Sequence, residues 1–205
     1  MIELKVIECA EKLVKFIGNK NFEPITQRTP YYHMGATITD SVLQAGLNYR
    51  HVVYPRIFRL LTKFSDYKTT CDFLILMQAV PLSELINWKN EAKLRRIHDI
   101  SWFLYDNRIE NENQLATWLE INENAMQLAQ INGVGPKTID YLKMLSGNQA
   151  IAIDRHLFKF LELAGIFNCS YQEASQIYCK TAELMDMSKF EMDRKIWKYM
   201  SNANI

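Results

Sequence analysis

Apolar residues recur at spacings of three and four along most of this chain, which is the period of an amphipathic α-helix. The first such stretch, residues 3–17, ends at Gly18. The pattern predicts further helices at residues 36–48, 50–64, 71–77, 81–86, 90–104, 115–119, 171–185 and 190–200. No alternation of strand, helix and strand appears, so the sequence predicts an all-α protein.

Two more helices are expected on either side of a glycine-containing turn. A short apolar face over residues 125–131 precedes it, and Pro136 begins the second helix, where its missing N–H costs nothing. Gly133 and Gly135 bracket Val134, so the backbone can take positive φ there. The N–H groups of the turn and of the helix start then point outward and can bind an anion such as a nucleic-acid backbone. A plain αα-turn is the alternative interpretation.

A single carboxylate, Asp154, follows the apolar run 150–153 and opens a helix that ends at Gly165. The ordinary role of an aspartate at this position is to cap the helix N-terminus. The functional alternative is a carboxylate held rigidly next to a reacting centre, and the two roles are compatible.

Composition limits the function classes. The chain has 205 residues, of which 48% are hydrophobic, enough for one compact domain or two closely packed lobes. The net charge of +1 excludes a polybasic nucleic-acid coat, so any DNA contact must come from a local patch and from backbone N–H groups. The most basic run lies between residues 50 and 68, where only Asp66 opposes the cations, and its residues form either a solvated face or a phosphate-facing edge. These cations are Arg50, Arg56, Arg59, Lys63 and Lys68.

The cysteines and the N-terminal segment indicate a compartment. The four cysteines form no CxxC pair, so neither a zinc site nor another metal site is expected. Residues 1–18 resemble a folded amphipathic helix rather than a signal peptide, and no apolar run reaches the roughly 20 residues of a membrane span. Scattered thiols without a secretion signal favour an intracellular protein of the cytoplasm or nucleoid, or of the nucleus in a eukaryote.

The combination of GVGPKT with IDRHLFKF closely resembles the helix-hairpin-helix DNA glycosylases, the superfamily of endonuclease III and 8-oxoguanine glycosylase. The family pattern is GVGxKxA followed by V-D-x-H-V/I-x-R. Lys159 replaces the family's arginine and Ile139 its alanine. The residues that match the first part are Gly133, Val134, Gly135, Lys137 and Thr138, and those that match the second are Ile153, Asp154, His156 and Leu157.

This resemblance implies two helical lobes with a helix-hairpin-helix motif and an active site in the cleft between them. One lobe would comprise residues 36–136, ending in the hairpin, and the other residues 1–35 and 137–205. The implied function is base-excision repair by a DNA glycosylase with AP lyase activity. Lys137 would attack C1′ of the sugar, which requires a neutral amine and therefore a pKa of roughly 7–8. Asp154 would stabilise positive charge on the sugar or act as a general base.

The resemblance also implies DNA contacts and a base pocket. Gln44 and Asn48 rank equally as the residue that fills the gap left by a flipped base, and Tyr31, Tyr32 and His33 could stack on that base or simply pack in the protein. The residues expected to bind DNA around the motifs are Gly133, Val134, Gly135, Thr138, Arg155, His156 and Lys159.

The expected partner is double-stranded DNA containing a damaged or modified base, bound by a monomer. Endonuclease III carries an iron–sulfur cluster on a C-terminal cysteine run, which is not found here, so no cluster and no other cofactor is expected. A monovalent cation at the hairpin is the alternative. Oxidised pyrimidines, oxidised purines and mispaired bases all stay open as substrates. A monofunctional glycosylase and a non-catalytic DNA-binding module are the alternative functions.

Overall fold

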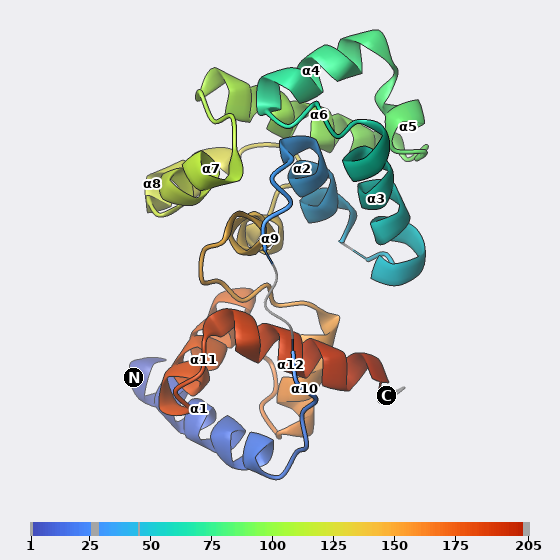
Figure 1. The fold of residues 1–205 in the computed structure, drawn as a ribbon. Helices are drawn as coiled ribbons and strands as arrows, with labels where there is room; N and C mark the ends of the chain where they lie inside the picture. The colour runs from blue at the N-terminus through green and yellow to red at the C-terminus, as the bar shows by residue number, and fades with distance from the viewer. Residues whose placement is uncertain (1, 26–28, 45, 203–205) are drawn as a thin grey trace. The chain divides into compact units, whose positions relative to one another are not determined.

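The computed structural model describes residues 2–25, 29–44 and 46–202, and every regular element in these ranges is a helix (Figure 1). The all-α prediction is therefore confirmed for the described residues. The chain divides into two compact units: unit 1 comprises Met1–Arg28 and Gln149–Ile205, and unit 2 comprises Thr29–Asn148. The resemblance to the glycosylases implied lobe boundaries at residues 36 and 136. The structure instead groups the helix at Pro136–Ser146 with unit 2, because that helix packs on two other helices of this unit.

Unit 1 is built on two helix pairs, α1 with α11 and α10 with α12. Its core contains the fully buried rings of Phe160 and Tyr178. The Tyr178 hydroxyl donates a 2.7 Å hydrogen bond to the Leu157 carbonyl, and burial raises the pKa of this tyrosine well above its ordinary value. The helices are α1 (Ile2–Gly18), α10 (Arg155–Leu163), α11 (Tyr171–Leu184) and α12 (Lys189–Asn202).

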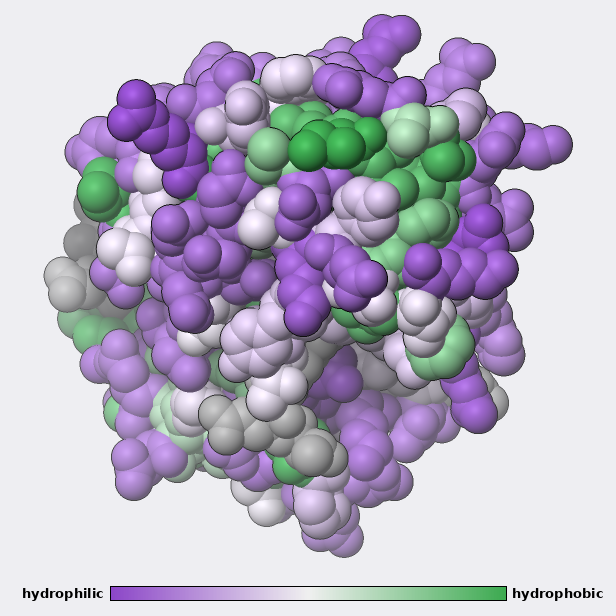
Figure 2. Space-filling model, turned by 45° about the horizontal axis from the view of Figure 1, so that its top comes forward, coloured by the Kyte–Doolittle hydropathy of each residue, from purple (hydrophilic) through white to green (hydrophobic). Residues whose placement is uncertain are grey.

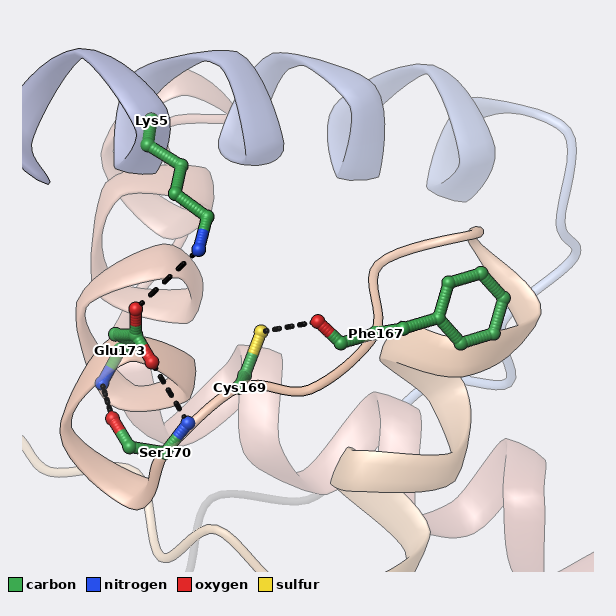
Figure 3. Close-up of polar contacts among 5 residues, drawn as sticks. All are labelled: Lys5, Phe167, Cys169, Ser170 and Glu173. Carbon is green, nitrogen blue, oxygen red and sulfur yellow. Dashed lines mark hydrogen bonds and ion pairs between the residues drawn. The ribbon is translucent and has the colours of Figure 1, made fainter.

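The start of α11 shows how local sequence fixes a helix end in unit 1 (Figure 3). The Ser170 hydroxyl accepts a 3.2 Å bond from the Glu173 N–H, and the Glu173 carboxylate accepts a 2.9 Å bond from the Ser170 N–H. This reciprocal capping box satisfies two N–H groups that the helix itself cannot bond. Lys5 of α1 lies 3.6 Å from the same carboxylate, so the cap also contacts the neighbouring helix.

Unit 2 is arranged around α2, all ten residues of which are buried. Helices α3, α4, α6 and α9 pack against it (Figure 1). The elements are α2 (Met34–Leu43), the π-helix η1 (Tyr49–Val53), α3 (Tyr54–Lys63), α4 (Thr70–Ala79), α5 (Leu82–Leu85), α6 (Glu91–Asp106), α7 (Glu112–Leu119), α8 (Asn122–Leu128) and α9 (Pro136–Ser146).

Two predicted helices of unit 2 differ most from the structure. The helix expected at residues 36–48 ends at Leu43, and Asn48 instead caps the next element, where its Oδ1 accepts a 2.9 Å bond from the His51 N–H. The helix expected at residues 50–64 is divided into η1 and α3. Pro55 lies in the first turn of α3, the part of a helix in which proline is best tolerated.

On the face that Figure 2 shows, hydrophilic residues predominate and hydrophobic residues gather in a patch toward the top of the view. Within the described ranges, no helix is both long enough and apolar enough to cross a membrane.

Helices α2 and α4 approach closely where Gly35 meets the buried ring of Phe73. A Cβ built on Gly35 would lie 2.5 Å from Cδ2 of Phe73, well inside van der Waals contact. We expect Gly35→Ala to lower the free energy of unfolding by about 1–3 kcal/mol, because the added methyl group overpacks this contact. Chemical denaturation monitored by circular dichroism measures the change.

The matched control is Gly18→Ala in the last turn of α1, where an added Cβ meets nothing within 4 Å. This variant should unfold within about 1 kcal/mol of the wild type. Equal destabilisation by both substitutions would contradict the proposed close contact between α2 and α4.

Candidate functional site

At one position in the turn between α8 and α9, the backbone conformation favours glycine. Gly133 has a φ of +80°, which favours glycine, and the Val134 N–H donates a 2.9 Å bond to the Ile131 carbonyl. The guanidinium group of Arg96, on α6, lies directly over Gly133, since an added Cβ would overlap its Nη2. Arg96 Nε also donates a 3.2 Å bond to the Asn132 carbonyl. The turn is therefore held against α6 by one arginine.

Gly135 differs from Gly133. Its φ of −116° and ψ of −179° are extended, so the positive φ that glycine would allow here is not used. A Cβ added at Gly135 would meet nothing within 4 Å. Neither the backbone conformation nor packing within the chain requires glycine there. As the N-cap residue of α9, Gly135 makes no side-chain capping bond, so the surface at this helix start is open.

Lys137 lies in the first turn of α9 and is half-buried, as predicted for the start of this helix. Its Nζ is 5.6 Å from the ring centroid of Tyr141, one turn further along α9. The cation–π contact favours the charged amine, but it is weak at this distance.

Two other cations lie near Lys137, both on α6. Lys93 is half-buried, and its Nζ donates a 3.0 Å bond to the Val42 carbonyl at the end of α2. Burial, together with the positive charges of Arg96 and Lys137, lowers the pKa of Lys93 to about 8. We call Lys93, Arg96 and Lys137 the cation cluster. Lys93 is not among the site residues predicted from the sequence, and nothing local to its position indicated its charged neighbours.

A buried carboxylate on α2 joins two of the predicted site residues. Asp40 is fully buried, and it accepts 2.7 Å hydrogen bonds from the Tyr31 hydroxyl and from the Gln44 amide. The Tyr31 and Tyr49 hydroxyl oxygens are 3.2 Å apart. The structure thus brings Tyr31 and Gln44 together, whereas Asn48 caps η1 instead. Asp40 was not predicted, although a charged residue inside an otherwise uncharged helix was a usable signal.

His33 lies in the core of unit 2 and caps the start of α2. Its Nδ1 accepts a 3.2 Å bond from the Ala36 N–H, so Nε2 carries the proton and donates to the Phe64 carbonyl at 3.2 Å. Burial lowers the pKa of His33. The neighbouring Tyr32 is 60% exposed and has a φ of 53°. The three residues predicted for a base pocket therefore lie in three different environments.

In unit 1, Asp154 is the N-cap of α10, as the sequence predicted. Its Oδ1 accepts bonds of 2.8 Å and 3.1 Å from the N–H groups of His156 and Leu157. The preceding segment is also held in place: the Ala152 N–H donates to Asp193 at 3.1 Å, and the Ile153 N–H to the Tyr171 hydroxyl at 3.2 Å. Asp154 is 8% exposed, and its carboxylate has a fixed orientation.

The other predicted DNA contacts in this unit lie along α10. Arg155 is exposed, and Lys159 pairs with Glu162 at 3.4 Å on the surface, a contact that contributes little to stability. The half-buried ring of His156 packs edge-on against Trp197, with 6.1 Å between centroids. Among the residues that the structure describes, no group of three or more His, Cys, Asp or Glu side chains is placed to hold a metal ion.

One protein family, described as Domain of unknown function (DUF8548), matches residues 86–201, more than half of the sequence. The chain belongs to this family. The DUF8548 region includes the cation cluster, the turn at Gly133 and the cap at Asp154, whereas Asp40 and its partners precede it. No curated protein and no solved structure matches the chain.

The burial of His33 makes stability depend on pH. Because the folded pKa is below the ordinary value of about 6.5, the unfolded chain binds more protons between these two values. The free energy of unfolding should therefore fall as the pH is lowered from 7 through 6.5 toward the folded pKa. We expect His33→Gln to remove most of this slope, as measured by urea denaturation at a series of pH values between 5 and 7.5.

His51→Gln, at an exposed histidine of η1, is the matched control and should keep the wild-type slope. If His33→Gln lowered stability equally at every pH, the buried neutral imidazole would not be the source of the dependence.

Proposed function

We propose that this protein is a DNA glycosylase with AP lyase activity, in which Lys137 is the nucleophile and Asp154 the supporting carboxylate. The observation that carries the proposal is the position of Lys137: half-buried in the first turn of α9, next to two other cations and directly after the glycine turn. This placement suits an amine that must lose its proton to react.

The electrostatics of the cation cluster support a lysine nucleophile. A lysine attacks carbon only as the neutral amine, so the ammonium form must be destabilised. The positive charges of Lys93 and Lys137 repel each other, and this repulsion is relieved when either group loses its proton. The positive end of the α9 dipole acts on Lys137 in the same direction.

The surface at the turn supports DNA binding. The open start of α9 presents N–H groups at the positive end of a helix, and the missing side chain at Gly135 leaves room for a close approach. Arg96 adds a guanidinium group at the same turn. A phosphate group complements the N–H groups, the room at Gly135 and the guanidinium group. A surface that binds a neutral ligand would not need this positive character.

Asp154 has the properties that the supporting carboxylate requires. Its two bonds from α10 N–H groups fix the direction of the carboxylate. Loss of a base leaves oxocarbenium-like positive charge on the sugar, which a fixed carboxylate stabilises.

The proposed reaction balances without a cofactor. The Lys137 amine forms a bond to C1′ as the bond from C1′ to the base breaks, and the base leaves with the electron pair and takes up a proton. Opening of the sugar ring gives a Schiff base between Nζ and C1′. Loss of a C2′ proton then breaks the bond from C3′ to the phosphate oxygen, which nicks the strand on the 3′ side. Tyr31 and Gln44, which both donate to Asp40, are our candidates for contact with the flipped base or the gap it leaves.

The direct test uses a duplex with a single abasic site and sodium borohydride, which reduces a Schiff base to a stable adduct. We expect the wild type to form a covalent protein–DNA adduct on a denaturing gel, and Lys137→Ala to form none. Lys143→Ala, at the other end of α9, is the matched control and should trap as the wild type does. The absence of an adduct with the wild type, or an adduct retained by Lys137→Ala, rules out the proposed nucleophile.

Asp154→Asn separates the charge of this residue from its capping role, since asparagine caps helices about as well as aspartate. We expect the variant to keep the wild-type unfolding midpoint and to lose base release by about a hundredfold or more. The assay is release of damaged bases from a panel of modified duplexes. Base release without a trapped adduct in the wild type would indicate the monofunctional glycosylase, and DNA binding without either would indicate a passive binding module.

Lys93 offers a test of the electrostatic argument. Replacing it with methionine removes a neighbouring positive charge while keeping a similar chain length. We expect Lys93→Met to move the pH of half-maximal adduct formation upward, because Lys137 then keeps its proton more firmly. Lys93→Arg, which restores a cation, should move it back toward the wild-type value. A profile unchanged in Lys93→Met would show that Lys93 does not act on the nucleophile.

A further inference from the structure

Three aromatic rings follow one another along η1 and α3 on the surface of unit 2. The ring centroids of Tyr49 and Tyr54 are 6.2 Å apart, and those of Tyr54 and Phe58 are 6.0 Å apart. Tyr54 is 45% exposed and Phe58 is 52% exposed. Large rings at an i, i+4 spacing normally turn toward a core, whereas these two face outward. We call Tyr49, Tyr54 and Phe58 the aromatic column.

The charge around the aromatic column has a single sign. Residues 49–63 contain three arginines and one lysine and no acidic residue. Two of the arginines have structural roles: the Arg56 guanidinium stacks 4.5 Å from the ring centroid of Trp88, and Arg59 Nε donates a 2.8 Å bond to the Leu85 carbonyl. Arg50 and Lys63 are exposed, one at each end of the segment.

Exposed rings flanked by cations match the chemistry of single-stranded nucleic acid. Every unpaired base has a flat face that stacks on an aromatic ring, and the phosphates that connect the bases are attracted to arginine and lysine. Intact duplex DNA keeps its base faces inside the helix, so its bases cannot stack on the rings. An apolar protein partner would have no groups to pair with the cations at both ends of the column.

We propose that the aromatic column binds single-stranded nucleic acid, with bases stacked on Tyr54 and Phe58 and phosphates against Arg50 and Lys63. This binding would give a function to the basic run at residues 50–68, which has no part in the proposed lyase chemistry. The binding does not depend on Lys137 or Asp154, so either proposal can fail without the other.

The test is fluorescence anisotropy with a labelled oligothymidylate of about fifteen nucleotides, within the usual site sizes for such surfaces. The decisive variant is Tyr54→Leu/Phe58→Leu, which keeps apolar surface and removes the flat faces. We expect its affinity to fall about tenfold or more, because each stacked base contributes strongly to binding. Phe58→Trp, which keeps a ring, should bind at least as tightly as the wild type.

Two further variants make the test specific. Arg50→Ala/Lys63→Ala should weaken binding and reduce the slope of log affinity against log salt by about 1.4, or about 0.7 for each phosphate that the protein no longer neutralises. Trp102→Leu/Tyr105→Leu removes two exposed rings of α6 and should bind the oligonucleotide as the wild type does.

The proposal is overturned if the wild type does not bind oligothymidylate, or if the leucine pair at Tyr54 and Phe58 binds it unchanged. Equal losses in this variant and in the α6 control would also overturn it, because the rings of α3 would then have no special part. Both leucine variants change exposed positions, and thermal unfolding by circular dichroism checks that each remains folded.

Discussion

The complete burial of α2 is the constraint on which the rest of unit 2 depends. A helix enclosed on every side needs partners inside the protein for its polar groups, and in α2 the Thr39 hydroxyl is a buried group that has none. Glu112 of α7 accepts hydrogen bonds from the Thr37 hydroxyl at 2.7 Å and from the His33 N–H at 2.8 Å. At the other end of α2, the Val42 carbonyl accepts from Lys93 of α6. The bond from Lys93 holds α6, which carries two residues of the cation cluster, against α2, and α9 with Lys137 packs on α2 as well. The surroundings of Lys137 therefore depend on an element remote from it in sequence.

The cation cluster is costly for stability, which is a reason to regard it as functional. Half-burying Lys93 next to two other positive charges destabilises its charged form, and the bond to the Val42 carbonyl offsets only part of that cost. Strongly shifted lysines of this kind concentrate at sites that bind anions or transfer protons. Asp154 shows the opposite arrangement, a carboxylate whose hydrogen bonds come from a helix start. Unit 2 thus has Lys137 at the start of α9 among positive charges, whereas unit 1 has Asp154 at the start of α10 with hydrogen bonds to its carboxylate.

The features that the sequence predicted correctly are local. Gly133, Pro136 and the cap at Asp154 follow from backbone preferences over a few residues, and the structure contains all three. The features it missed depend on long-range contacts. The end of α2 at Leu43, the neighbours of Lys93 and the inclusion of α9 in unit 2 are set by packing between segments far apart in the chain. Both glycines of the turn allow a positive φ and look equivalent in sequence, whereas in the structure only Gly133 adopts one.

The contact of Arg96 with the turn links ligand binding to proton uptake. Arg96 lies on the glycine turn and also lowers the pKa of Lys93, three residues earlier on α6. An anion that binds at the turn and neutralises Arg96 would weaken the repulsion on Lys93, so the pKa of Lys93 would rise on binding. By thermodynamic linkage, protonation of Lys93 would then strengthen anion binding by the same factor. Because the pKa of Lys93 is about 8, the complex would take up a fraction of a proton from the buffer in that range, which calorimetry in buffers of different ionisation enthalpy would detect.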